Sequence, residues 1–200
     1  MWPKEGRRGG NAYDVIVVGG GASGMMAAGR AAARGRKVLL LEKNKRLGEK
    51  LSITGGKRCN ITNAEYDVRT LLAHYGDASD FLYSSFSQFG VKDTFTFFEN
   101  LGLPLVIQAR KRAFPKTEKA PDVVKALERY IAAGSVTVKT GATVTRIAPG
   151  DGTMSVHVGK TEHKGAAVIL ATGGVSHPET GSTGDGFKFL KSLGHTVVAP

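Results

Sequence analysis

Short apolar runs alternate with glycine-rich and polar stretches in the N-terminal part of the chain. Tyr13–Val18 and Val38–Leu41 are continuous aliphatic and β-branched runs, which predict buried strands. Between them, Ala22–Arg34 is rich in alanine and predicts a helix, and Gly35 is the residue type that commonly follows a helix end. The order strand, tight turn, helix, strand predicts one βαβ unit.

Hydrophobic periodicity predicts further elements downstream. The predicted helices are Phe81–Phe89, Val91–Asn100, Pro121 to about Ala133, and Gly184–Ser192. The predicted strands are Leu105–Gln108, Val136–Lys139, Thr143–Ile147, Met154–Val158 and Ala167–Ala171. The third and fourth of these strands flank Pro149–Gly152 and predict a hairpin, and the last predicts another buried strand.

Two stretches lack such a simple pattern. Lys43 to Glu65 shows no clear period and predicts a long loop, and a long loop within a compact domain is usually functional. The first two downstream helices carry an aromatic stripe, which we expect to pack in the core. Its members are Phe81, Phe86, Phe89, Phe95, Phe97 and Phe98.

Length and composition are those of a folded soluble chain. With 200 residues, 41% hydrophobic and 22% charged, it can bury a sizeable core, and its composition argues against wholesale disorder. The single cysteine excludes an internal disulfide and indicates a reducing, cytoplasmic compartment. The longest charge-free apolar stretch, Val15 to Gly29, is shorter than the roughly 20 residues of a spanning helix, so no membrane partner is expected.

The net charge of +11 is large for a chain of 200 residues. Basic residues gather between Arg30 and Arg58, where lysines and arginines far outnumber acids, and again between Arg110 and Lys119. Two interpretations stay open: a solvated basic face, or a surface for an anionic partner such as nucleic acid or a phosphorylated cofactor.

A glycine fingerprint follows the first predicted strand. Gly19, Gly21 and Gly24 occupy the glycine positions of G-x-G-x-x-G, and the pattern opens a predicted helix. The first glycine makes the turn, the second lets backbone approach a pyrophosphate, and the third packs the helix against the strand. Ala22 and Ser23 begin that helix, whose free N–H groups attract phosphate.

An acidic residue completes the fingerprint. Glu42 ends the second predicted strand, at the position where a carboxylate accepts hydrogen bonds from ribose hydroxyls and repels a 2′-phosphate. The same βαβ unit serves FAD and NAD(H), so the fingerprint alone predicts a dinucleotide site without choosing the dinucleotide.

The stretch Leu47–Asn63 joins paired glycines, cations and the only cysteine. Cations beside a flavin would stabilise its anionic reduced form. Cys59 has two interpretations: a reactive thiol whose thiolate Lys57 and Arg58 favour, or a small buried apolar residue.

Ala171–Gly174 is another strand-to-glycine turn, of the kind that brings backbone close to a dinucleotide. His177 follows it and is either a proton donor or a solvated side chain. The other histidines show no metal-ligand spacing, so no metal site is predicted.

Several motifs occur in one order that resembles a known family. They are Asp14–Gly24, Thr54–Asn63, Arg112–Pro115, Ala171–Gly174 and Gly181–Gly186. Together they resemble the BaiN-type, or aminoacetone-oxidase-like, FAD-dependent oxidoreductases. The resemblance implies an α/β, Rossmann-like FAD-binding domain of the glutathione-reductase type, with a parallel sheet, an added β-hairpin and a helical segment.

The resemblance also assigns residues to the cofactor. The Gly19–Gly24 turn would hold the FAD pyrophosphate and Glu42 the adenosine ribose, and Lys43 is a further expected cofactor contact. Thr143 and Val144 would touch the adenine through backbone. The remaining implied contacts lie toward the flavin end and on the other side of the dinucleotide: Lys50, Gly55, Gly56, Asn60, Ala171, Thr172 and Gly173.

The expected organisation is a flexible leader over residues 1–12 and an FAD/NAD(P)-binding domain over 13–200. The resemblance implies that this domain is incomplete, with an inserted substrate domain and a final FAD-contacting segment beyond residue 200. The expected function is that of an FAD-dependent oxidoreductase whose flavin is reduced by NAD(P)H and whose acceptor is open.

Two alternatives to that function stay open. One is a flavin-dependent reductase that converts uridine of ribosomal RNA to dihydrouridine, which the basic charge favours. The other is a non-catalytic nucleotide- or RNA-binding fragment, or a subunit of a split flavoprotein. The substrate is thus a small molecule or RNA, and the sequence does not determine the oligomeric state.

Overall fold

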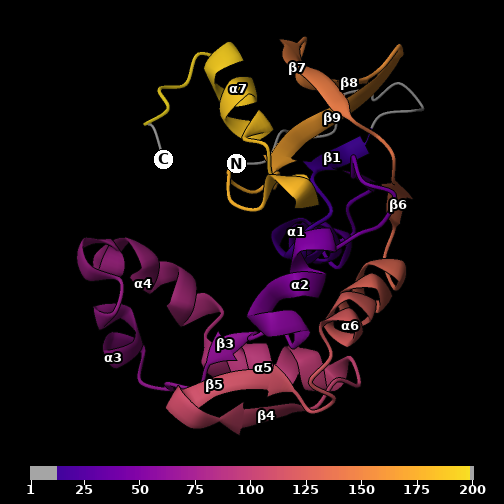
Figure 1. Cartoon of the computed structure of the whole chain (residues 1–200). Helices are drawn as coiled ribbons and strands as arrows, with labels where there is room; N and C mark the ends of the chain where they lie inside the picture. Colours follow the sequence, from indigo (N-terminus) through magenta and orange to yellow (C-terminus); the bar gives the residue numbers. More distant parts are fainter. Residues whose placement is uncertain (1–12, 199–200) are drawn as a thin grey trace. The chain divides into compact units, whose positions relative to one another are not determined.

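The structure, a computed structural model, describes residues 13–198, so the expected leader at 1–12 lies outside the described residues. Its contacts divide these residues into two compact units (Figure 1). The first unit contains residues 13–50 and 130–198, and the second contains residues 51–129.

The first unit is built on a six-stranded sheet in the order β6-β2-β1-β9-β8-β7. Strands β6, β2, β1 and β9 run parallel, whereas β9, β8 and β7 are antiparallel neighbours. Its strands and helices, in chain order, are β1 (Tyr13–Val18), α1 (Ala22–Ala32), β2 (Val38–Leu41), β6 (Val136–Lys139), β7 (Val144–Gly150), β8 (Thr153–Val158), β9 (Thr161–Leu170), a 3-10 turn (Pro178–Thr180) and α7 (Asp185–Ser192).

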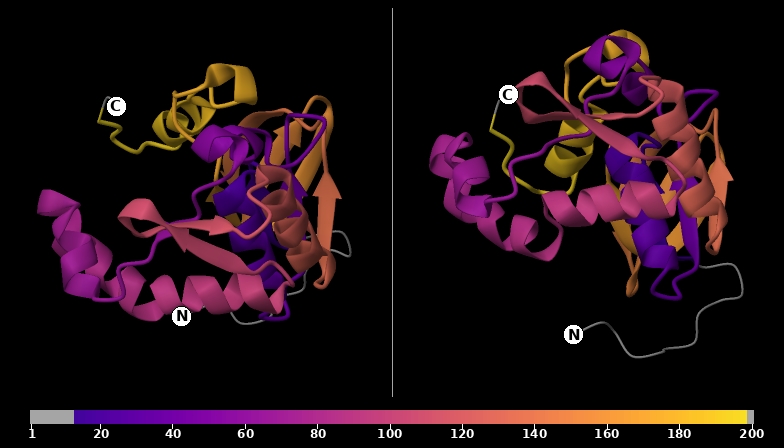
Figure 2. Two further views of the ribbon diagram at one scale, coloured as in Figure 1. Left: turned by 60° about the horizontal axis from the view of Figure 1, so that its bottom comes forward. Right: turned by 90° about the horizontal axis from the view of Figure 1, so that it is seen from below.

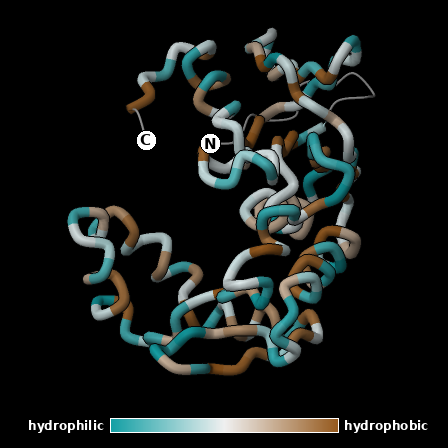
Figure 3. Tube along the Cα trace, in the orientation of Figure 1, coloured by the Kyte–Doolittle hydropathy of each residue, from teal (hydrophilic) through white to brown (hydrophobic). Residues whose placement is uncertain are grey.

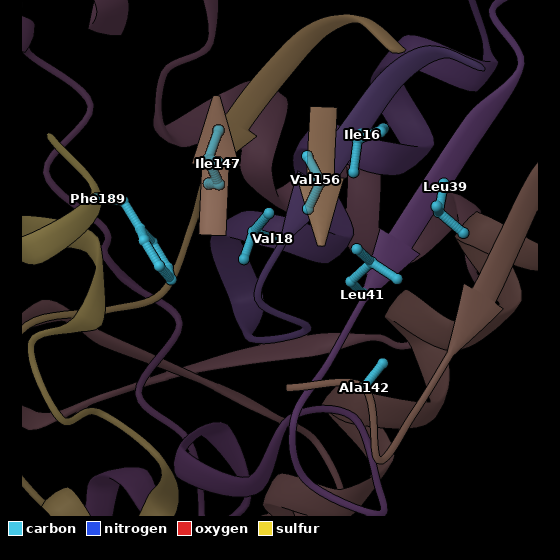
Figure 4. Close-up of a cluster of buried hydrophobic side chains, with 8 residues drawn as sticks. All are labelled: Ile16, Val18, Leu39, Leu41, Ala142, Ile147, Val156 and Phe189. Carbon is cyan, nitrogen blue, oxygen red and sulfur yellow. The ribbon is translucent and has the colours of Figure 1, made fainter. Parts of the chain in front are cut away.

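Both faces of the central strands are buried, which explains why the sequence there is continuously apolar rather than alternating. One face of β1 and β2 packs with residues of the β7–β8 hairpin and of α7 (Figure 4). The buried members of this cluster are Ile16, Val18, Leu39, Leu41, Ala142, Ile147, Val156 and Phe189. On the opposite side of the same two strands, Val17 and Leu40 are fully buried as well.

The βαβ unit is confirmed. The strands β1 and β2 have the predicted bounds, and α1 ends near Gly35, whose φ of +71° is the left-handed conformation that glycine tolerates. The hairpin around Pro149–Gly152 is confirmed as β7 and β8.

The last strand differs from the prediction in length and burial. Strand β9 begins at Thr161 rather than Ala167, because its first half pairs antiparallel with β8 before its second half pairs parallel with β1. Its second half is not fully buried, since Ile169 is 37% exposed.

The second unit contains a small antiparallel sheet in the order β3-β5-β4. The elements of this part of the chain are α2 (Glu49–Lys57), β3 (Thr62–Asn63), α3 (Val68–Ala73), a 3-10 turn (Gly76–Ala78), α4 (Ser79–Gln88), α5 (Val91–Asn100), β4 (Leu105–Gln108), a 3-10 turn (Ala109–Lys111), β5 (Arg112–Pro115) and α6 (Ala120–Ala132). The helices α2 and α6 contain the boundaries between the units. Along α6, hydrophobic and hydrophilic residues alternate with the helical turns (Figure 3).

The prediction of a loop from Lys43 to Glu65 is wrong in part, because this stretch contains α2 and β3. The helix α2 is interrupted at Thr54, whose ψ is 155°, and Gly55 and Gly56 both have positive φ. A helix broken within its second turn leaves no period for a sequence window to detect.

The prediction that the whole aromatic stripe packs in the core is also wrong. Helices α3 and α4 lie side by side (Figure 2), but no residue of α4 is buried and Phe81 is 84% exposed. Phe98 on α5 is buried as expected. Periodicity identified the helices, but it does not say whether another element covers the apolar face.

No helix between residues 13 and 198 combines the length and the apolar character needed to cross a bilayer.

Candidate functional site

The glycine turn after β1 brings backbone segments into contact that a side chain would separate. Gly19 has a φ of +107°, and a Cβ there would lie 2.3 Å from the carbonyl oxygen of Ala171. A Cβ on Gly24 would lie 1.8 Å from the carbonyl oxygen of Gly19. Two of the three fingerprint glycines are therefore required by packing against neighbouring backbone.

Gly21 differs from its neighbours because a Cβ there would meet nothing within 4 Å. It is the N-cap of α1, with extended backbone and no side-chain cap. Ala22 and Ser23 follow it in the first turn and are exposed. The first N–H groups of a helix have no partner within the helix, so this open end can receive an anionic group.

The Glu42 carboxylate accepts hydrogen bonds from both the glycine turn and the segment that follows β2. Its side chain is buried; Oε2 accepts from the Gly20 amide at 2.6 Å, and Oε1 accepts from the Asn44 amide at 2.7 Å. A carboxylate oxygen can accept two hydrogen bonds, so each oxygen keeps acceptor capacity for a ribose hydroxyl.

Thr143 and Val144 are placed next to this carboxylate residue. The Ala142 amide donates to the Glu42 carbonyl oxygen at 2.8 Å, which sets the start of β7 beside the end of β2. Thr143 is exposed and Val144 is half-buried.

The turn after β9 reaches the same edge of the sheet. The Ala171 amide donates to the Val18 carbonyl oxygen at 2.8 Å, which continues the pairing of β9 with β1. Gly173 has a φ of +71°, and a Cβ there would lie 2.7 Å from Ser182 Oγ. A Cβ on Gly186, at the start of α7, would lie even closer to Thr172 Oγ1, at 2.4 Å. The structure thus brings the two predicted glycine turns together.

The two predicted basic ligands contact protein groups of this region. Lys43 Nζ donates to Thr183 Oγ1 at 2.8 Å and forms a 2.9 Å ion pair with Asp185. Hydrogen bonds from Lys43 and Thr183 lower the pKa of Asp185 to about 2, so this carboxylate is ionised at neutral pH. Lys50 Nζ donates to the Ser176 carbonyl oxygen at 2.7 Å.

Gly55, Gly56 and Asn60 belong to the second unit, where they lie on one strained loop with Cys59. A Cβ on Gly55 would lie 2.7 Å from the Asn60 amide nitrogen. The Asn60 side-chain amide, oriented for hydrogen bonding, donates to the carbonyl oxygens of Thr62 and Ala113. The φ of Lys57 and Cys59 is also positive, which is costly for residues other than glycine and is typical of functional loops.

Cys59 is 2% exposed. Burial raises the pKa of its thiol, and a hydrogen bond with Thr54 offsets only part of this shift. The environment favours the neutral thiol despite the cations beside it in the sequence.

His177 is exposed and lies in a left-handed backbone conformation. Its Nδ1 is 2.9 Å from Glu179 Oε1, and this hydrogen bond lowers the pKa of the Glu179 carboxyl. Between residues 13 and 198, no group of three or more His, Cys, Asp or Glu side chains could hold a metal ion.

Comparison with known proteins identifies the family. Residues 13–200 match the model of the HI0933-like protein Rossmann domain. The chain belongs to the HI0933-like family. The prediction of a Rossmann-like α/β fold of the FAD-binding type is therefore confirmed.

Two curated relatives and one solved structure resemble this HI0933-like domain. A 3-dehydro-bile acid delta(4,6)-reductase of Clostridium scindens is 32% identical over 184 residues, which are 90% of this chain and 44% of that protein. A ribosomal RNA dihydrouridine synthase of Escherichia coli is 26% identical over 186 residues, 93% of this chain and 46% of that protein. A 3-ketosteroid-delta4-(5alpha)-dehydrogenase of Rhodococcus jostii shares the fold, with a TM-score of 0.60 and 18% identity over 82% of this chain and 46% of that one.

The HI0933-like domain contains site residues that sequence reasoning did not single out. Asn44, Ser176, Thr180, Thr183 and Asp185 make contacts beside the glycine turns. The glycine-rich run Gly181–Gly186 was a signal for this segment, but nothing local indicates its partners.

The thiol of the HI0933-like domain offers a test of its environment. Because burial raises the folded pKa of Cys59, the free energy of unfolding is highest, as far as this thiol is concerned, below the unfolded pKa, and it falls as pH rises through the folded pKa. We expect iodoacetamide at pH 8 to modify the native protein at least about tenfold more slowly than the urea-unfolded protein. Equal rates would contradict the buried neutral thiol.

Proposed function

We propose that this chain is the dinucleotide-binding part of a BaiN-type FAD-dependent oxidoreductase whose flavin is reduced by NAD(P)H. The observation that carries the proposal is the open end of α1 at Gly21, held beside the buried carboxylate of Glu42. The pyrophosphate would lie at the helix end and the adenosine ribose at the carboxylate.

The chain's own residues supply binding and orientation. The N–H groups at Ala22 and Ser23 carry the positive end of α1 and neutralise part of the pyrophosphate charge. Glu42 accepts from ribose hydroxyls, and Thr143 and Val144 border the adenine. FAD, when bound, supplies an isoalloxazine ring that accepts and donates hydride.

The chain spans less than half the length of the curated relatives it matches. Two classes of substrate are candidates for the acceptor that the reduced flavin would reduce. Kinship to a bile-acid reductase at 32% identity favours a small hydrophobic acceptor. The +11 charge and kinship to ribosomal RNA dihydrouridine synthases favour RNA. We propose the small molecule first, since cofactor phosphates and solubility account for basic residues as well.

Anaerobic reduction tests the proposal. We expect the FAD-loaded protein to lose flavin absorbance on addition of NADH or NADPH, and to regain it when the acceptor is added. A protein that binds FAD but is reduced by neither nucleotide would contradict the assigned reductant. Binding of ribosomal RNA that weakens steeply with salt would move RNA ahead of the small molecule, because phosphate contacts release counterions.

A further inference from the structure

Side chains of Lys43, Asn44 and Lys50, in the segment after β2, make polar contacts with the segment after β9. The strongest is made by Lys43, whose ammonium contacts Thr183 Oγ1 at 2.8 Å and Asp185 Oδ2 at 2.9 Å. Both charged side chains are about two-thirds buried, with 28% and 31% of their surface exposed. A charge-assisted contact of this kind is stronger than a fully exposed ion pair.

The other two contacts are hydrogen bonds to backbone carbonyl oxygens. Asn44 Nδ2 donates to the Thr180 carbonyl oxygen at 2.9 Å, and Lys50 Nζ donates to that of Ser176 at 2.7 Å. A Cβ on Gly181 would lie 2.8 Å from Asn44 Nδ2, so the segments are closely packed where they meet. We call these three contacts the cross-loop latch.

The latch connects the two sides of the candidate site. In the sheet, β1 lies between β2 and β9, and all three strands are parallel, so the segments that follow them leave the same edge. Glu42 contacts the glycine turn from one side through Gly20, and Ala171 contacts it from the other through Gly19. A ligand on that turn lies between two segments that are tied together.

The segment from Gly174 to Gly184, drawn between β9 and α7 in Figure 1, contains one 3-10 turn and buries only two of its residues. Val175 and His177 within it are exposed, whereas Ser182 is buried. A segment with few buried apolar contacts opens at low cost once its polar ties are broken.

We propose that the cross-loop latch limits the rate at which the dinucleotide enters and leaves, and that Asp185 is the residue that positions Lys43 in it. The inference rests on the proposed function for the identity of the ligand. Opening would precede both entry and release, so loosening the latch accelerates both and changes the equilibrium little.

FAD exchange kinetics test the proposal through Lys43→Met and Asp185→Asn. Each removes the ion pair, and we expect both the association and the dissociation rate constants of FAD to rise about tenfold, the effect of losing one charge-assisted contact. The dissociation constant should change less than about threefold. Lys188→Met is the matched control, since Lys188 contacts the same carboxylate from within α7, at 3.4 Å, without joining the segments.

Two results would overturn the latch. One is unchanged rate constants in both variants. The other is faster dissociation with unchanged association in Lys43→Met alone, which would make Lys43 a direct cofactor ligand. Hydrogen exchange of residues 174–184 in the FAD-free protein separates this question from the proposed function. The latch requires faster exchange in Lys43→Met and Asp185→Asn than in Lys188→Met, whether or not FAD binds.

Discussion

Replacing Gly24 by alanine is expected to destabilise the first unit by about 3 kcal/mol and to abolish FAD binding. The new Cβ would lie 1.8 Å from the Gly19 carbonyl oxygen and 2.9 Å from its carbon, and both atoms are backbone with no rotamer to move. Alanine is otherwise favoured over glycine inside a helix by about 1 kcal/mol, so a loss would be due to this contact. Urea unfolding followed by circular dichroism measures the change.

The matched control is Gly21→Ala in the same turn. Nothing lies within 4 Å of a Cβ there, and the φ of −77° suits any residue. We expect stability to stay within about 1 kcal/mol of wild type, the range for an alanine N-cap. FAD affinity should nevertheless fall about tenfold or more, because the methyl group occupies the approach of the pyrophosphate. Equal destabilisation by the two variants would contradict the packing account.

Replacing Glu42 by glutamine is expected to cost about 2–4 kcal/mol of stability and to weaken FAD binding strongly. Both carboxylate oxygens accept from backbone N–H groups, at Gly20 and Asn44. An amide keeps only one acceptor oxygen, so one N–H would face an NH2 group in a buried position. Thermal unfolding and FAD titration measure the two effects.

Asp151→Asn provides the control for the change of charge. Asp151 is exposed in the turn between β7 and β8, where asparagine is well tolerated. We expect neither stability nor FAD affinity to change measurably. A Glu42→Gln protein that behaved like this control would show that the buried carboxylate is not required.

The sequence was sufficient to predict the βαβ unit. The burial of a continuous apolar run such as Val38–Leu41 follows from its composition, and Gly24 is needed because a Cβ there would meet the backbone of Gly19, five residues earlier in the chain. Glu42 follows from the same pattern, because a carboxylate at the end of the second strand has a known role beside a dinucleotide. These features depend on neighbours in the chain, so a local pattern reveals them.

The second unit was less predictable for physical reasons. Strand β3 has two residues, and β5 carries an arginine and ends in Pro115, so neither has a strand-like composition. β3 and β5 are strands because they hydrogen-bond to neighbouring strands, and not because of their own residue types. The exposure of Phe81 could not be predicted either, since the sequence of a helix does not state what covers it.

The contacts around the glycine turns were beyond the sequence as well. Lys43 and Thr183 are 140 residues apart, and they come into contact because the segments after the parallel strands β2 and β9 leave the sheet at the same edge. Lys43 was expected to contact the cofactor, whereas the latch proposal pairs its ammonium with Thr183 and Asp185 instead, and the FAD exchange kinetics of Lys43→Met distinguish the two roles. Only three-dimensional proximity identifies Asp185 as its partner.

A titration of the purified protein with FAD, followed by visible absorption before and after desalting, tests most directly whether the glycine turn is the pyrophosphate site. We expect saturable one-to-one binding and flavin bands that persist through desalting. In Gly21→Ala we expect binding at least about tenfold weaker and bands that are lost on desalting, while that variant stays folded. A folded wild-type protein that takes up no FAD, or a Gly21→Ala protein that retains it as well as wild type, would contradict the assignment of the glycine turn as the pyrophosphate site.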